Sequence, residues 1–223
     1  MTPISINGVE VLIEDSESYL QINDINEKDI EGIWQRLSQQ YPGYELCFCF
    51  RNMEVPEAAM SAIGARVIDD CIDMRLQAED YKPCDTSQST AALLTEADFD
   101  EFAALLDATQ DSDFYWTSER TKKKMDIWRI YVCKGNGKIV GYTMLCIGIR
   151  GGLIGEIFCV EADSAAMRND LISAAAHGAF ENGKSTLLYM VDRDDAQEYE
   201  AALAAGLKVS GHYKGFSVMI PAR

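Results

Sequence analysis

Two segments far apart in this chain share one pattern: an apolar strand, a helix and a second strand. The early copy lies between Asn26 and Val67, and the late copy lies between Arg168 and Val209. Shifting one onto the other by 142 positions (188 − 46) aligns six identical residues, at Leu46/Leu188, Arg51/Arg193, Ala59/Ala201, Ala62/Ala204, Gly64/Gly206 and Val67/Val209. A repeat of this length indicates a duplicated half-domain rather than a solenoid of short units.

The composition limits the class of protein before any motif is considered. The chain has 223 residues, of which 48% are apolar and 25% charged, as in soluble globular proteins of one large or two small domains. No stretch contains the roughly 20 apolar residues that a membrane helix needs. The N-terminus also lacks the basic start and the apolar core of a secretory signal. We therefore expect a cytoplasmic protein with no membrane partner.

The net charge of −16 argues against nucleic acid as a partner, because its phosphates would be repelled. A cationic partner such as an amine fits this charge, although acidity more often serves solubility. None of the seven Cys residues forms a CxxC pair, and the two His residues lie far apart in sequence. We therefore expect no metal site and no disulfide framework. Buried reduced thiols are expected in the apolar strand-like runs, at Cys47, Cys49, Cys133, Cys146 and Cys159.

Residues 1–80 are expected to form a small first domain. Asn7-Gly8 between two apolar runs predicts a hairpin over 4–13, since this pair favours the two-residue hairpin turn. Asn26 is a good helix N-cap after an alternating strand over 19–25. A buried strand over 45–50, a helix from Pro56 to Gly64 and a strand over 66–76 follow. Residues 81–92 are polar, carry no periodicity and predict a linker.

Residues 93–223 are expected to form a complete second domain. Thr95 and Asp98 predict a capping box, and a second helix is expected over 117–126. Three strands then predict an antiparallel meander, with turns at 135–137 and 150–152. The remaining expected elements are a long helix that ends at Gly183, a strand over 186–191, a helix over 194–205 and strands over 207–210 and 213–220. This order predicts a mixed central β-sheet flanked by helices, in the α/β (α+β) class.

That order resembles the GNAT N-acetyltransferase superfamily. The segments that carry the resemblance are KIVGYTMLCIG (138–148), GEIFCV (155–160), EAALAAGLKV (200–209) and SVMI (217–220). Gly206-Leu207 stands where the family has a Gly-Phe pair, and Gly64-Ala65 does so in the first half. The resemblance implies a duplicated acyl-CoA N-acyltransferase (GNAT) fold, with a truncated GNAT-like half over 1–80 and a complete GNAT-like domain over 93–223.

The resemblance also implies acetyl-CoA as a co-substrate, bound where the long helix begins. GNAT proteins carry a Q/R-x-x-G-x-G/A loop there, whose backbone amides hold the diphosphate. Here the loop is DSAAMR (163–168), with no glycine and with Asp163 in place of Gln or Arg, although Arg168 can pair with a phosphate. The expected coenzyme-binding residues are Phe158, Cys159, Val160, Ala165, Ala166, Met167, Arg168 and Asn169. In the first half only one residue separates strand from helix, so we expect no coenzyme there.

Acetyl transfer needs a base for the amine, a donor for the oxyanion and an acid for the leaving thiolate. Glu156 is the expected base, because GNAT proteins often carry an acid at this place and apolar neighbours would raise its pKa if it is buried. The alternative is a Glu that faces outward from a partly open strand. The resemblance gives the oxyanion to the backbone N–H of Cys159 or Val160. It gives the acid to a Tyr at the position of Ala202, for which Tyr199 could substitute.

The strand residues Tyr189 and Tyr213 are expected to be packing residues instead. The leading hypothesis is an N-acetyltransferase that moves an acetyl group from acetyl-CoA to an amine of a small molecule or peptide, as a monomer or homodimer. The alternative is a catalytically silent GNAT-fold binding or scaffold protein. The missing loop glycines, the missing Tyr and the acid at position 163 favour that alternative.

Overall fold

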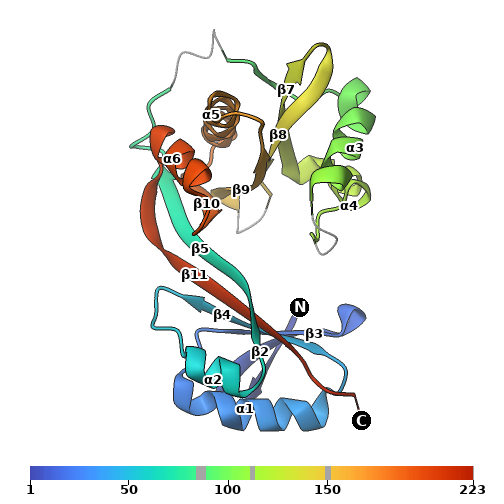
Figure 1. Cartoon of the computed structure of the whole chain (residues 1–223), viewed down its shortest axis with the longest axis vertical. Coiled ribbons are helices and arrows are strands. Elements are labelled where there is room, and N and C mark those ends of the chain that lie inside the picture. The colour runs from blue at the N-terminus through green and yellow to red at the C-terminus, as the bar shows by residue number, and fades with distance from the viewer. Residues whose placement is uncertain (84–88, 111–113, 149–151, 223) are drawn as a thin grey trace. The chain divides into compact units, whose positions relative to one another are not determined.

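A computed structural model describes residues 1–83, 89–110, 114–148 and 152–222, which divide into two compact units (Figure 1). Unit 1 comprises Met1–Ile72 and Gly211–Arg223, and unit 2 comprises Asp73–Ser210. The division expected from the sequence placed residues 211–223 in the second domain. The structure groups them with the first part of the chain.

Unit 1 is a sheet with two helices. Its strands follow the order β1-β2-β3-β4-β11, in which β1, β2 and β3 are antiparallel neighbours and β3 is parallel to β4. Asn7 and Gly8 have φ angles of 51° and 81°, so the predicted hairpin turn is confirmed. The elements are β1 (Thr2–Ile6), β2 (Val9–Glu14), η1 (Asp15–Glu17), β3 (Tyr19–Asn23), α1 (Glu27–Gln40), β4 (Glu45–Arg51), α2 (Glu57–Ala62) and β5 (Arg66–Gln77).

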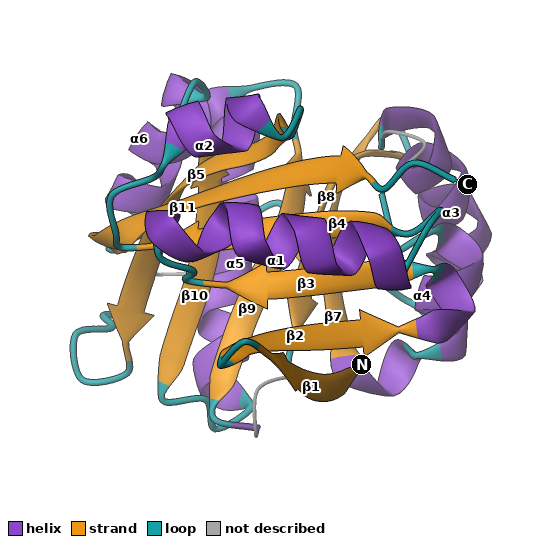
Figure 2. Ribbon diagram, turned by 90° about the horizontal axis from the view of Figure 1, so that it is seen from below, coloured by secondary structure: helices purple, strands orange, loops and turns teal. Residues whose placement is uncertain are grey.

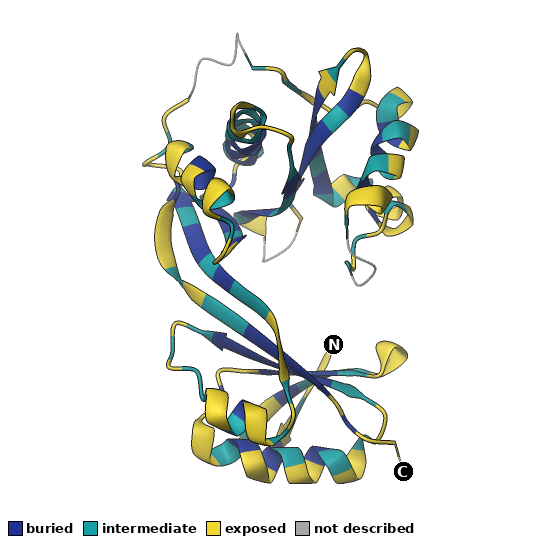
Figure 3. Ribbon diagram, in the orientation of Figure 1, coloured by how far each residue is buried: buried dark blue, intermediate teal, exposed yellow. Residues whose placement is uncertain are grey.

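Helix α1 covers one face of this sheet and lies along β3 and β4 (Figure 2). Its apolar stripe of Ile30, Ile33 and Leu37 is buried and Trp34 is half-buried beside it, while the polar residues between them stay exposed (Figure 3). Asn26 is the N-cap residue as predicted, but its side chain makes no capping hydrogen bond. Apolar burial along the stripe is therefore the main local reason for this helix to form.

Unit 2 is a larger sheet with helices on both faces. Its strands follow the order β5-β10-β9-β8-β7-β6; β6 to β9 are antiparallel, and β9 is parallel to β10. The α3 face buries an apolar cluster around Phe102, Trp128 and Tyr142, and α5 packs on the other face. The elements are β6 (Ala91–Leu93), η3 (Glu96–Asp98), α3 (Phe99–Thr109), α4 (Ser118–Lys123), η4 (Met125–Ile127), β7 (Trp128–Gly135), β8 (Lys138–Cys146), β9 (Ile154–Glu161), α5 (Ala165–Glu181), β10 (Thr186–Asp192), α6 (Ala196–Ala204) and β11 (Lys208–Met219).

Several predicted details of unit 2 are wrong. The end of the expected linker forms β6, because residues 91–93 pair with β7. Thr95 caps no helix amide; its hydroxyl donates to the Asp98 carboxylate, and α3 begins only at Phe99. The helix expected over 117–126 stops at Lys123, and the two late strands are one strand, β11. Most of the turn expected at 150–152 lies outside the described residues.

The last strand of each half of the chain contributes to both units. Strand β5 follows α2, but from Asp73 onward it belongs to unit 2, beside β10. Strand β11 follows α6, but from Gly211 onward it belongs to unit 1, where Tyr213–Met219 pair antiparallel with β4. Neither sheet is therefore completed by the strand that comes next in its own half.

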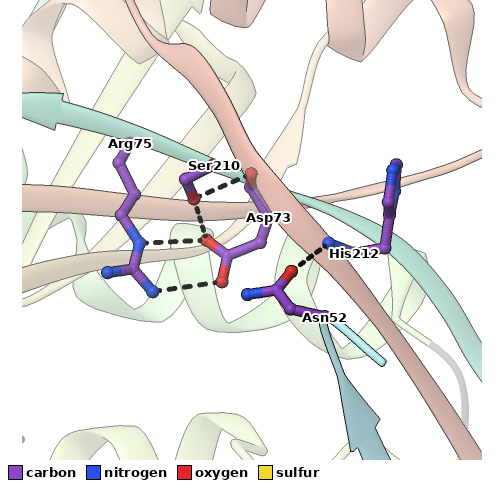
Figure 4. A network of polar contacts seen from close by, with 5 residues as sticks. All are labelled: Asn52, Asp73, Arg75, Ser210 and His212. Carbon is purple, nitrogen blue, oxygen red and sulfur yellow. Dashed lines mark hydrogen bonds and ion pairs between the residues drawn. The ribbon is translucent and has the colours of Figure 1, made fainter. Parts of the chain in front are cut away.

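Side-chain contacts hold each of these strands in place. In unit 2 the fully buried Asp73 accepts hydrogen bonds from the Arg75 guanidinium at 3.2 and 3.3 Å and from the Ser210 hydroxyl at 3.0 Å (Figure 4). In unit 1 the Asn52 side chain accepts from the His212 amide at 2.8 Å. A buried carboxylate is stable only when it is paired in this way.

Two further features bear on the class of protein. None of the helices in the described part of the chain is long and apolar enough to cross a membrane. Among the same residues, no group of three or more His, Cys, Asp and Glu side chains is arranged to hold a metal ion. The cysteines of the strands are free thiols, and all except the half-buried Cys159 are buried.

Candidate active site

The strands β9 and β10 separate before either of them ends. Their parallel pairing runs from Thr186↔Ile154 to Tyr189↔Ile157. Strand β9 continues to Glu161 and β10 continues to Asp192 without further pairing between them. The sequence reasoning expected a coenzyme between splayed strands at this place, near 154–160 and 187–192. The register shows that the two strands do diverge there, which leaves backbone groups of β9 unpaired on that side.

A β-bulge in β9 lies next to this fork. Met144 of β8 pairs with Cys159, whereas the next residue, Leu145, pairs with Ile157, so Phe158 is the extra residue. A bulge turns peptide groups out of the regular ladder and redirects the side chains around it. The backbone of Phe158, Cys159 and Val160 is therefore the part of β9 that can offer donors to a ligand in the fork.

Three residues separate β9 from helix α5, and the front of this helix is exposed. Ser164 is the N-cap, and its hydroxyl accepts a hydrogen bond from the Met167 amide at 3.2 Å. The amides of Ala165 and Ala166 have no acceptor among the described residues, as expected for the first amides of a helix. The first turn contains no acidic residue. In the expected anion site, the Met167 amide is thus already hydrogen-bonded within the protein, whereas the amides of Ala165 and Ala166 are free to bind a ligand.

Met167 and Arg168 point away from this exposed front. Met167 packs on the sheet, where a Cβ on Gly141 would lie 2.4 Å from its sulfur atom. The Arg168 guanidinium donates to the Gln197 side chain of α6 at 2.9 Å, while its Nε is buried without a partner among the described residues. The side-chain oxygen of Asn169 is buried and unpartnered in the same sense. The contact with Gln197 directs the Arg168 side chain toward α6.

Glu156 lies on the face of the sheet that α3 covers. In the sheet register Trp128, Cys146, Glu156 and Leu188 occupy one row across four strands. Residues in such a row share a face, and Trp128 and Cys146 belong to the core under α3. Glu156 is 6% exposed and sits on a central strand, so the alternative of an outward-facing Glu does not describe this residue.

Aromatic rings surround this face next to the bulge. The Phe158 ring centroid lies 5.2 Å from that of Trp128, and the Trp116 centroid lies 5.0 Å from that of Trp128. Trp128 is 1% exposed, whereas Phe158 and Trp116 are half-buried. A carboxylate and a wall of aromatic side chains therefore occupy the same face of β7 to β9.

Tyr199 and Ala202 lie on α6, which follows β10. Ala202 is fully buried, and Tyr199 is half-buried with no hydrogen bond to its hydroxyl among the described residues. The buried face of this helix consists of Ala201 and Ala202, and Glu198 lies one turn earlier on it. The role of Tyr199 as an acid stays a prediction.

Sequence reasoning missed Glu198, whose pKa is shifted to near neutrality. Burial raises it from the ordinary value of 4.5 to about 7; the nearby Tyr189 hydroxyl and Arg168 lower it, and Asp195 and Asp192 raise it. The available signal was its position four residues before Ala202, which places it on the same helix face.

The corresponding part of unit 1 is closed. All five residues of β3 pair with β4, and Asp24 extends the contact through its own amide to the Cys49 carbonyl and through its carboxylate to the Arg51 amide, both at 2.8 Å. Three residues, not one, connect β3 to α1. Even with this longer connection, β3 and β4 do not diverge, because Asp24, its first residue, continues the pairing with β4.

The residues of unit 2 fit a thiol-bearing nucleotide such as coenzyme A. The fork beside the bulge suits an extended arm that takes the place of a strand, and the open amides of α5 suit its diphosphate. Buried polar atoms without partners at Arg168 and Tyr189 lie where the helix, the fork and α6 meet. Such orphaned groups are rare in folded proteins unless a ligand or water completes them.

Comparison with known proteins agrees with this geometry. No family model matches the sequence, and no curated protein matches it. A functionally unknown conserved protein of Staphylococcus epidermidis has a TM-score of 0.65 at 14% identity, over 98% of this chain and 94% of that protein. A GCN5-related N-acetyltransferase of Sphaerobacter thermophilus gives 0.62 at 17% identity, over 96% and 77%. A tandem GNAT protein of the clavulanic acid biosynthesis pathway, solved without acetyl-CoA, gives 0.61 at 9% identity, over 96% and 79%. The chain therefore has the GNAT N-acetyltransferase fold.

Proposed function

We propose that this protein transfers an acetyl group from acetyl-CoA to an amine of a small molecule or peptide. The observation that carries the proposal is the fork between β9 and β10, which opens beside the bulge at Phe158 and leads to the exposed front of α5. A fold alone does not fix a function, so the proposal rests on this site rather than on the overall likeness.

Each role falls to a group that the site already contains. The open amides of Ala165 and Ala166 would hold the diphosphate, and the backbone of β9 beyond Ile157 would hold the arm that bears the thioester. The coenzyme supplies an activated acyl group. An N–H of Cys159 or Val160 would stabilise the oxyanion, since backbone donors fixed in place need no reorganisation during the reaction.

Glu156 would take the proton from the amine. A carboxylate with 6% exposure on a central strand keeps its position, and the aromatic rings on the same face of the sheet would exclude water from a bound amine. The net charge of −16 favours the approach of a cationic amine over that of an anion.

A catalytically silent protein with the same fold is the second candidate. The absence of glycine from the loop at 163–168 and the Ser164 hydroxyl on the Met167 amide support it, because both reduce the room and the donors for a diphosphate. The two candidates differ in a single property, which is the binding of acetyl-CoA.

Thermal unfolding with and without acetyl-CoA separates them. Ligand at 100 times its Kd stabilises the folded state by about 2.7 kcal/mol, which raises the midpoint by several degrees. If the midpoint rises, Glu156→Gln should keep that shift and lower turnover about 100-fold or more. Glu200→Gln, at an exposed position on α6, is the control. An unchanged midpoint in the wild type would favour the silent protein, and full turnover in Glu156→Gln would remove Glu156 from the mechanism.

A further inference from the structure

Tyr189 occupies the position at which the fork opens. It pairs with Ile157 in the last register pair between β10 and β9. Its side chain is 1% exposed, and its hydroxyl has no hydrogen-bond partner among the described residues. A buried hydroxyl without a partner costs stability, so its presence calls for an explanation other than packing.

Groups from three elements interact electrostatically with this hydroxyl. The Glu198 carboxyl of α6 interacts with it most strongly, although no hydrogen bond of regular geometry joins the two, and Cys159 of β9 and the positive charge of Arg168 of α5 also act on it. Asp195 and Asp192 add negative charge around Glu198. Burial and the nearby Glu198 carboxyl raise the pKa of Tyr189 well above its ordinary value, so its oxygen keeps its proton at neutral pH.

Ala202 and Ala201 are the buried residues of α6, and neither has a polar side chain. The resemblance in the sequence places a Tyr at position 202, which this chain lacks. The buried hydroxyl that the structure does bring to this side of the fork comes from strand β10 instead.

We infer that Tyr189 is a catalytic residue that protonates the thiolate leaving group, and that Glu198 positions its hydroxyl and returns the proton; this rests on the proposed acyltransferase activity. Packing alone would be served equally well by Phe, which has no hydroxyl to bury. The pairing of a strand Tyr with a helix Glu would replace the Tyr that is absent from α6.

The proton and electron movements balance. The amine nitrogen forms a bond to the acyl carbon, the carbon–sulfur bond breaks, and its electron pair remains on sulfur. Tyr189 gives its hydroxyl proton to that sulfur, and Glu198 gives its own proton to the resulting phenolate. Glu156 receives the proton that the amine loses, and exchange with water returns Glu156 and Glu198 to their starting states.

Tyr189→Phe tests the inference, with Tyr131→Phe on β7 as a matched control. Three quantities are measured: thermal stabilisation by acetyl-CoA, kcat with tyramine and with spermidine as acceptors, and the pKa of the thiol of bound coenzyme A from its ultraviolet absorbance. Tyr189→Phe should keep the stabilisation, lower kcat about 100-fold and raise the pKa of the bound thiol, because a donor to sulfur is lost. Tyr131→Phe should change none of these.

Glu198→Gln tests the role of Glu198 in returning the proton to Tyr189. Its kcat should lose the decline above neutral pH that the wild type shows as Glu198 gives up its proton. If the wild type binds acetyl-CoA and turns over while Tyr189→Phe matches it in kcat and thiol pKa, the inference fails alone. A loss confined to Tyr199→Phe would overturn it in the same way. A wild type that acetyl-CoA does not stabilise would overturn the proposed function and this inference together.

Discussion

The segment β3–α1–β4 in unit 1 and the segment β9–α5–β10 in unit 2 are both a strand, a helix and a parallel strand. In unit 1 the strands stay paired to the end of β3, and Asp24 prolongs the contact. In unit 2 the pairing stops at Tyr189↔Ile157, four residues before β9 ends. The difference teaches that the β-α-β pattern by itself does not decide whether its two strands stay paired or diverge.

The two helices differ in the same sense at their first turns. Helix α1 carries Glu27 and Asp29 there, while the first turn of α5 contains no acid. Acids stabilise the start of a helix by meeting its partial positive charge, but they also occupy the charge that an anion would use. In unit 1 the partial positive charge at the start of α1 is therefore met by the helix's own acidic side chains. In unit 2 no acid of the first turn meets the corresponding charge of α5.

The largest expected effect concerns whether a fragment that contains β9–α5–β10 can fold by itself. A fragment of residues 93–223 lacks β5 and leaves the edge of β10 unpaired, so we expect no cooperative thermal transition. A fragment of residues 73–210 keeps all of unit 2 and should unfold cooperatively in circular dichroism. Cooperative unfolding of the 93–223 fragment would show that β5 is dispensable.

Glu198→Gln should stabilise the protein at high pH. The carboxyl has a higher pKa when folded, near 7, than the ordinary 4.5, so the folded state takes up a proton. Wild-type stability therefore falls as pH rises from about 4.5 to 7 and stays at the lower level above it, a cost of roughly 3 kcal/mol. Gln does not titrate, so the variant should gain a large part of that amount at pH 8 and little near pH 4.

Denaturant unfolding at both pH values checks this, with the exposed Glu200→Gln as the control. Equal gains at both pH values would mean that burial of charge at position 198 is not the cause.

Ala166→Glu gives α5 the kind of first turn that α1 has. The new carboxylate should repel a diphosphate and abolish the stabilisation by acetyl-CoA, which is about 2.7 kcal/mol at 100 times Kd. Without ligand the variant should be as stable as the wild type, because an acid at this position suits the helix. Ala166→Gln, which adds bulk without charge, is the matched control. Undiminished stabilisation of Ala166→Glu would place the diphosphate elsewhere.

The smallest expected effect compares the two N-caps. The Ser164 hydroxyl accepts from the Met167 amide, whereas the Asn26 side chain makes no capping hydrogen bond. Ser164→Ala should therefore cost about 1 kcal/mol, and Asn26→Ala should cost clearly less. Chemical denaturation of the two variants measures the difference. Equal costs would show that cap hydrogen bonds do not distinguish the helices.

Local signals in the sequence located most elements because their causes are local. The Asn7-Gly8 turn, the stripe on α1 and the antiparallel strands of unit 2 follow from residue spacing and backbone preference. The predictions of secondary structure failed where a contact with a segment distant in sequence decides the structure. Strand β6 looked like linker because three residues carry no period, and only pairing with β7 makes them a strand.

The candidate site divides in the same way. The sequence predicted Glu156, the loop at 163–168 and the strands on either side of the fork as parts of a site, because a resemblance in element order carries those positions. It could not locate the bulge at Phe158, which depends on the register between β8 and β9. It also could not indicate that Glu198 acts on Tyr189, because these residues belong to different elements, α6 and β10.

By itself, then, the sequence determined the order of strands and helices, their apolar faces and the acidic character of the chain, all set by residues near one another along the backbone. Tertiary structure alone decided which strand follows β10 in the sheet, where β9 and β10 part, and which acid is buried. Those outcomes depend on hydrogen-bond register and on desolvation, and both arise only when segments distant in sequence come together.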